Sequence, residues 1–127
     1  MEIGFLDKKQ EDLCENQRLL QRKKGEAIVK SMAKHLANLA AVEVLEDMYK
    51  FPGKFEELTD DRAGQFSLRL DKKHRLILVP ATAPIPRNEE GKIDWDKKII
   101  PRKPDGGIDL KQVTAVIIVE AVSEHYE

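Results

Sequence analysis

Two arginines and a histidine are the residues of this chain best suited to acid–base chemistry at a phosphate. Arg75 opens an otherwise apolar run that extends to Val79, Arg62 precedes it in the chain, and His125 stands near the C-terminus. A guanidinium donates two parallel hydrogen bonds and keeps its charge, whereas an imidazole exchanges protons near neutral pH. With no metal-binding or phosphate-loop motif beside them, these side chains fit metal-independent cleavage of RNA, in which a ribose 2′-hydroxyl attacks the adjacent phosphate.

Further polar side chains are expected to bind substrate around these three. They are Arg69, Lys72, Lys73, His74 and Tyr126. Simpler roles exist: Arg62 can pair with Asp60 or Asp61, the paired lysines can form a solvated turn, and a terminal histidine can be idle. Arg75 is the hardest to dismiss, because an unpaired charge in an apolar strand is costly.

The elements that must position these residues begin with a β-hairpin. Residues 66–70 alternate apolar and polar side chains, as a half-buried strand does, and residues 71–74 form a short polar connection. Residues 75–79 and 114–122 are apolar on both faces, which is typical of central strands. Residues 1–6 add a short N-terminal strand, and Pro80 is expected to close the strand that precedes it.

Helices are expected to come first in the chain. Asp7 is a candidate N-cap for a helix that extends to about Lys24, with a break near Asn16. A longer helix is expected from Glu26 to about Tyr49, with a wide apolar face that can cover a sheet. His35, at the edge of that face, is most simply structural.

Together these elements predict one α+β domain over residues 1–127, with the N-terminal helices packed on one face of a mainly antiparallel sheet. Residues 80–112 form a long insertion before the last strand and hold five of the six prolines. Within it, residues 85–94 and 100–109 are near-repeats that share Ile, Pro, Arg, Gly, Ile and Asp. We expect a duplicated loop element, and an insertion this long should contain short ordered pieces, dock on a partner or be mobile. Trp95 either anchors the insertion or contacts a partner.

Composition narrows the class of protein. The 127 residues carry a net charge of −1, and aromatic residues make up only 6%, which argues against an aromatic stacking platform for nucleic acid. Only residues 50–76 are positive, with seven basic against five acidic side chains. The single cysteine, Cys14, is expected to be a buried apolar residue. No signal peptide or membrane span is evident, so we expect a cytoplasmic protein without metal or cofactor.

The central motifs resemble those of the RelE/ParE toxin superfamily, and most closely its HigB-like branch, whose members are also called killer or killer-suppression proteins. The matching stretches are Glu57-Leu58, Arg62-Ala63-Gly64-Gln65-Phe66-Ser67-Leu68 and His74-Arg75-Leu76-Ile77-Leu78. They correspond to E-L, R-x-G-Q-[WFY]-S-[IVL] and Y-R-[LI] in that family. The similarity covers most of the chain except residues 80–112.

This resemblance implies a bacterial type II toxin that cuts mRNA, often in the ribosomal A site, and is neutralised by a helix-turn-helix antitoxin. It matches Arg75 to a strand arginine that contacts phosphate, Arg62 to the arginine of R-x-G, and His125 to the histidine of a terminal D-Y-H motif. Ser123 and Glu124 replace the Asp and Tyr of that motif. Two alternatives therefore stay open: a non-catalytic protein of the same fold that binds an antitoxin or operator DNA, and a ParE-like inhibitor of DNA gyrase.

Overall fold

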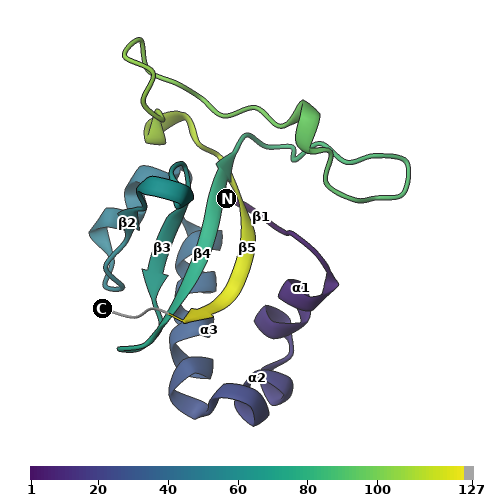
Figure 1. Cartoon of the computed structure of the whole chain (residues 1–127), viewed down its shortest axis with the longest axis vertical. Coiled ribbons are helices and arrows are strands. Elements are labelled where there is room, and N and C mark those ends of the chain that lie inside the picture. The colour runs from purple at the N-terminus through teal and green to yellow at the C-terminus, as the bar shows by residue number, and fades with distance from the viewer. Residues whose placement is uncertain (125–127) are drawn as a thin grey trace.

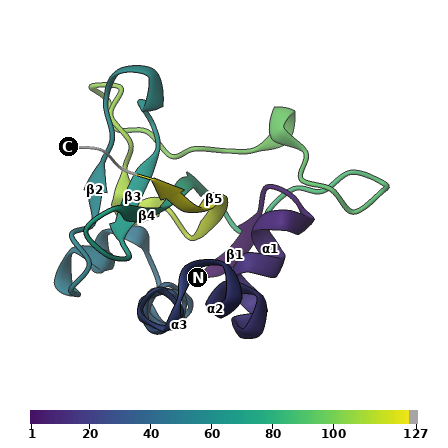
Figure 2. The same cartoon turned by 60° about the horizontal axis from the view of Figure 1, so that its bottom comes forward.

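A five-stranded sheet with three α-helices on one of its faces forms the body of the molecule (Figures 1 and 2). The computed structural model describes residues 1–124, so two of the predicted site residues, His125 and Tyr126, lie outside the described residues. The strands and α-helices are β1 (Glu2–Phe5), α1 (Lys8–Glu15), α2 (Gln17–Lys24), α3 (Glu26–Ala41), β2 (Glu56–Glu57), β3 (Phe66–Arg69), β4 (His74–Ala81) and β5 (Ala115–Glu124). Short 3-10 helices are η1 (Leu45–Lys50), η2 (Asp60–Arg62), η3 (Trp95–Lys97) and η4 (Leu110–Gln112).

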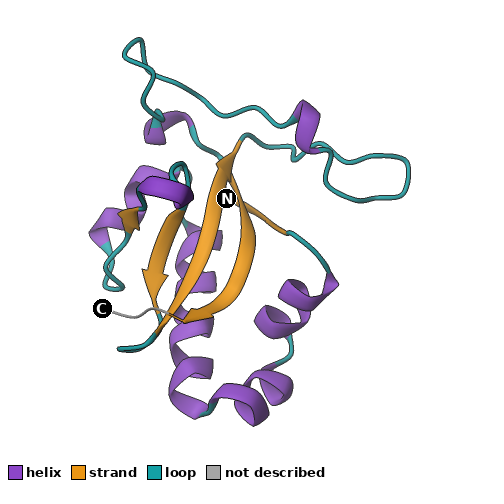
Figure 3. Ribbon diagram, in the orientation of Figure 1, coloured by secondary structure: helices purple, strands orange, loops and turns teal. Residues whose placement is uncertain are grey.

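The sheet confirms the expected α+β class and is mixed rather than wholly antiparallel. Its strand order is β1-β5-β4-β3-β2, and only β1, which pairs with β5, runs parallel to its neighbour. All four expected strands form (Figure 3), but the expectation that Pro80 closes its strand is wrong. Pro80 and Ala81 continue β4 and pair with Val116 and Ala115 of β5. The short strand β2 was not expected, because two residues are too few to show an alternating pattern.

Side-chain caps fix the helix starts. The carboxylate of Asp7 accepts the amide hydrogen of Gln10, and the Asn16 side chain accepts that of Leu19, so Asn16 ends α1 and starts α2 as the sequence predicts. The expected helix to Tyr49 is wrong beyond Ala41. Val42 and Val44 adopt extended backbone conformations, and the chain resumes as η1 with the Leu45 amide bonded to the Val113 carbonyl.

The main core lies between the helices and the sheet. Its fully buried side chains include Leu20, Ile28, Met32, Leu39, Phe66, Leu68, Leu76, Leu78 and Ile118. Cys14 packs against Met32 in this core, as expected, and burial raises the pKa of its thiol to about 12. Among residues 1–124, no helix is long and apolar enough to cross a membrane.

The insertion consists of two copies of one small hairpin, as the sequence repeat predicts. Arg87 pairs with Ile93 in the first copy, and Arg102 pairs with Ile108 in the second. In each copy the arginine guanidinium donates to the carbonyl of the turn glycine, at 3.2 Å to Gly91 and at 3.0 Å to Gly106. Both glycines have positive φ, and each hairpin leads into a 3-10 helix.

The two hairpins pack on opposite faces of the sheet. Ile93 is buried with Val79, Ala81, Ile85, Ala115 and Ile117, on the face away from the helices. Ile108 is buried in the helix-side core. The connecting segment therefore crosses over the edge of the sheet where β4 ends and β5 begins, and it is held at both sides (Figure 1). Trp95 is 41% exposed, so Ile93 and Ile108, not Trp95, are the buried anchors.

His35 is buried and links α3 to the end of β3. Its Nε2–H donates to the Arg69 carbonyl at 2.7 Å, and Nδ1 has no hydrogen-bond partner among the described residues. Gly53 lies against the imidazole, and its carbonyl accepts the Arg69 amide at 2.7 Å. Burial lowers the pKa of His35; the Arg69 hydrogen bond opposes this shift and the charge of Lys34 adds to it.

We expect acidification to destabilise the fold through His35. A lowered folded-state pKa means that the stabilisation is fully present above the unfolded value of about 6.5 and is lost progressively as the pH falls below it. Urea unfolding measured between about pH 7.5 and about pH 5.5 should therefore show a falling free energy of unfolding. His35→Gln should flatten this dependence, whereas the matched variant His74→Gln should keep it. An equal slope in wild type and His35→Gln would contradict the assignment.

Candidate functional site

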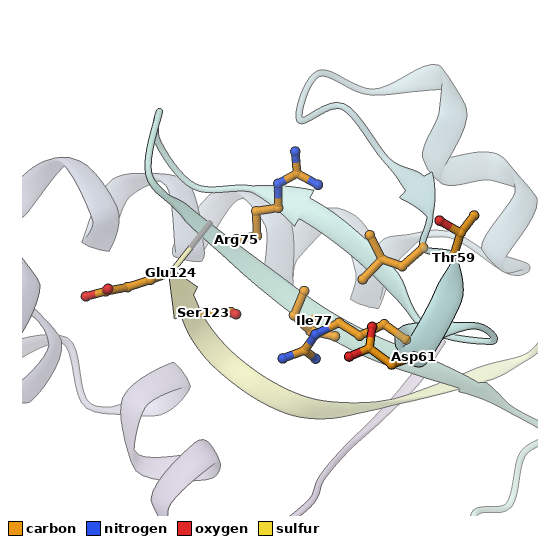
Figure 4. Close-up of a pocket in the computed structure, with 8 residues that line it drawn as sticks. Thr59, Asp61, Arg75, Ile77, Ser123 and Glu124 are labelled. Carbon is orange, nitrogen blue, oxygen red and sulfur yellow. The ribbon is translucent and has the colours of Figure 1, made fainter. Parts of the chain in front are cut away.

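The two arginines singled out in the sequence line one pocket on the face of the sheet opposite the helices. The pocket has a volume of about 250 Å³ and is lined by Leu58, Thr59, Asp61, Arg62, Arg75, Ile77, Ser123 and Glu124. Figure 4 shows Arg75 and Ile77 on β4, Ser123 and Glu124 at the end of β5, and Thr59 and Asp61 across from them. The pocket therefore joins three separate segments of the chain.

Arg75 is held rigidly by β2 and β3. Its Nη1 donates to Glu56 Oε1 at 2.7 Å and to Ser67 Oγ at 3.3 Å. Only 8% of Arg75 is exposed, and Ser67 is buried. The guanidinium has five N–H donors, and all its hydrogen bonds within residues 1–124 use Nη1. Nε and Nη2 therefore keep donors that can bind a ligand anion.

Arg62 is held by β5 rather than by the acidic residues beside it in sequence. Its Nη2 donates to Glu120 Oε1 and its Nη1 to Gln65 Oε1, both at 2.9 Å. Burial by itself would raise the pKa of Glu120, but hydrogen bonds from Ser123 and Arg62 and the Arg62 charge lower it overall. Glu120 is thus a carboxylate at neutral pH, and it neutralises Arg62.

Among residues 1–124, carboxylates outnumber cations around this pocket. Arg62 and Arg75 face Asp61 and Glu124 in the lining, and their ion-pair partners are Glu120 and Glu56. A phosphate entering the pocket would meet arginines that already have carboxylate partners, so the site by itself is a weak anion trap. The pocket is therefore better suited to orienting a phosphate that another part of the protein already binds than to capturing a free anion from solution.

The other predicted substrate-binding residues within residues 1–124 lie outside the pocket lining. Arg69 stands opposite Arg75 on the neighbouring strand. Lys72 and Lys73 are exposed in the hairpin turn. His74 bonds through Nδ1 to Asp71 Oδ1 at 2.9 Å, within a turn that Asp71 also caps. Strand alternation directs His74 to the face opposite Arg75. The backbone thus places Arg62 and Arg75 together and His74 apart from them.

Glu120 and Glu56 are the ion-pair partners of the two pocket arginines, and neither is among the site residues predicted from the sequence. Glu120 interrupts an apolar strand, which is a usable signal for a buried ion pair. Glu56 stands in a two-residue strand beside Glu57, and nothing in the sequence distinguishes these two carboxylates. Among residues 1–124, no group of three or more His, Cys, Asp or Glu side chains is placed to hold a metal ion.

Comparison with known proteins identifies the fold. No family model matches the chain, and no curated protein sequence matches it. The structure is similar to the YoeB/ParE toxin from Agrobacterium tumefaciens, with a TM-score of 0.54 and 14% identity over 99% of this chain and 100% of that chain. It is similar to the YoeB-YefM complex from Staphylococcus aureus, with a TM-score of 0.50 and 16% identity over 99% and 98% of the two chains. The α+β fold is therefore that of YoeB/ParE-type toxins.

Proposed function

We propose that this chain is the toxin of a type II toxin–antitoxin pair and that it cuts mRNA without a metal ion. The observation that carries the proposal is the Arg75–Glu56 pair, in which a buried guanidinium that lines the pocket lies 2.7 Å from a carboxylate. Cleavage of RNA needs such a cation to stabilise charge on phosphorus and such a base to accept the 2′-hydroxyl proton. The sequence motifs around Arg62 and Arg75 independently resemble the RelE/ParE superfamily, with the HigB-like branch as the closest match.

The residues divide the chemistry between them. Glu56 accepts the proton of the 2′-hydroxyl as its oxygen bonds to phosphorus, while Arg75 donates hydrogen bonds to the non-bridging oxygens through its remaining N–H groups. The bond from phosphorus to the 5′-oxygen breaks, and His125 protonates that oxygen. The products are a 2′,3′-cyclic phosphate and a 5′-hydroxyl. His125 and Tyr126 follow Glu124, which lines the pocket.

The partner proposed is a small antitoxin. One structural neighbour is a YoeB-YefM complex, which supports a partner protein here too. From the resemblance we expect a helix-turn-helix antitoxin encoded beside this chain. Copurification of the two expressed together tests this, and ribosome dependence is tested by adding ribosomes to the RNA cleavage assay.

Glu56→Gln should lower the rate of RNA cleavage by about 10²- to 10⁴-fold, since an amide cannot accept the 2′-hydroxyl proton. The measurement is single-turnover cleavage of a labelled mRNA with and without ribosomes, with detection of the cyclic phosphate end. Glu57→Gln is the matched control: it changes the neighbouring residue of the same strand and should keep full activity. His125→Ala should also relieve growth inhibition on expression. If wild type leaves every RNA intact in both conditions, the proposal is wrong.

A second candidate function is binding without catalysis. Both arginines of the pocket are neutralised by carboxylates of the same chain. The same pairing is expected in a site that has lost its catalytic activity. In that case the chain acts by binding an antitoxin or operator DNA. A tight antitoxin complex together with no cleavage under any ribosome condition would favour it.

A further inference from the structure

The insertion carries a run of basic residues that lies outside the pocket lining. Residues 97–103 contain four basic residues and no acidic one, in a chain of net charge −1. We define the basic strip as Trp95, Lys97, Lys98, Ile99, Arg102 and Lys103. Asp96 and Asp105 flank its cations in the sequence. Within residues 1–124, none of these four cations forms an ion pair, in contrast to Arg62 and Arg75.

The strip combines this charge with exposed apolar side chains. The ammonium of Lys98 lies 5.3 Å from the centre of the Trp95 ring, and Trp95 is 41% exposed. Ile99 is 65% exposed, the largest value among the exposed large apolar side chains. Burial lowers the pKa of Lys98, and the charge of Arg102 lowers it further, so the two cations repel each other. A nearby anion would remove this repulsion.

The fold holds the strip in place. Ile93 anchors the chain before it on the pocket face of the sheet, and Ile108 anchors the chain after it in the helix-side core. The Thr82 hydroxyl donates to the Ile99 carbonyl at 3.1 Å, and Lys98 donates to the Pro80 carbonyl at 3.4 Å. The surface is therefore preorganised, which lowers the entropic cost of binding.

The strip lies beyond the end of the strand that carries Arg75. Arg75, Ile77, Val79 and Ala81 alternate onto the same face of β4, and the first hairpin packs on Val79 and Ala81. Six residues of strand separate Arg75 from Ala81, which is about 20 Å. The pocket and the strip therefore lie toward opposite ends of β4.

We infer that the basic strip binds single-stranded RNA, as the surface that holds the substrate whose cleavage the pocket would perform. The cations contact phosphates, and Trp95 stacks on one base; a single indole is not a stacking platform, so the phosphate contacts supply most of the affinity. The inference rests on the proposed function, and it assigns to the insertion the anion binding that the carboxylate-rich pocket lacks.

The test measures binding apart from cleavage. Fluorescence anisotropy of a labelled single-stranded RNA of about twelve nucleotides is recorded against salt, with Arg75→Ala as the background that prevents cleavage. Lys97→Gln with Lys103→Gln should weaken binding about 10-fold and reduce the slope of log affinity against log salt by about 1.4. The matched control, Lys23→Gln with Lys24→Gln on α2, removes the same charge from exposed positions and should bind as the background does.

Trp95 gives a second readout, because it is the only tryptophan. RNA should quench its fluorescence, and Trp95→Ala should weaken binding about 5- to 100-fold. Equal binding by the strip and control variants, or no quenching, would overturn the inference. So would quenching by the antitoxin but not by RNA.

The outcomes also separate the inference from the proposed function. If wild type cuts RNA and the strip variants bind and cut equally well, the inference fails and the function stands. If RNA binds through the strip and is never cut, the function fails and the inference stands.

Discussion

Replacing Arg75 with alanine is expected to reduce RNA cleavage by about 10²- to 10³-fold while the chain stays folded. The guanidinium is fixed by Glu56 and Ser67, so its remaining donors need no reorganisation when charge develops on the phosphate. The loss should appear in kcat rather than KM, because the interaction strengthens in the transition state. Single-turnover rates and RNA affinity, measured on the same preparations, separate these two effects.

Two further variants make the Arg75 result specific. Arg75→Lys keeps the charge but not the planar fork, so it should restore only part of the rate. Arg18→Ala removes an arginine from an exposed position of α2 and should leave the rate unchanged. The Glu56 carboxylate is partly exposed, so water can hydrate it when Arg75 is replaced by alanine. The midpoint of thermal unfolding should therefore change little. If a folded Arg75→Ala protein cut RNA at the wild-type rate, Arg75 would have no part in the chemistry.

Local patterns were sufficient to predict most of the fold. Asp7 acts as the predicted cap, and Asn16, the predicted break, caps the second helix, because the side chains of both reach nearby free amides. The long helix was overextended because Val42 and Val44 leave helical conformation through a tertiary contact, the Leu45–Val113 hydrogen bond, which spans 68 residues. Pro80 remains in β4 for a similar reason: its role depends on the pairing with Val116, which sequence spacing does not reveal.

The sequence was sufficient to predict only part of the candidate site. Arg75 was conspicuous because a cation opens an apolar run, and the structure places it in a pocket with Arg62. Its partner Glu56 comes from β2, nineteen residues earlier, and only the antiparallel pairing of β2 with β3 brings it within reach. His74 was also predicted to lie at the site because it precedes Arg75 in sequence. Arg75 lines the pocket, but the His74 side chain lies outside the lining and bonds to Asp71.

Gly53→Ala is expected to lower the free energy of unfolding by about 2 to 5 kcal/mol. Gly53 has a φ of +127°, which an alanine adopts only with strain. A Cβ built there lies 2.5 Å from Cε1 of the buried His35 ring, so the imidazole must move and release its hydrogen bond to the Arg69 carbonyl. Urea and thermal unfolding measure the loss.

Gly25→Ala and Gly64→Ala separate the clash from the backbone strain. Both glycines also have positive φ, at +96° and +88°, but apart from the adjacent residues in the chain no described residue has an atom within 4 Å of the added methyl group. These variants should cost only the backbone term of about 1 to 2 kcal/mol, and the excess at Gly53 then measures the contact with His35. That contact fixes the end of β3, where Arg69 stands opposite Arg75, so Gly53→Ala should also slow RNA cleavage. Equal destabilisation at all three positions would show that His35 gives way freely and does not brace the site.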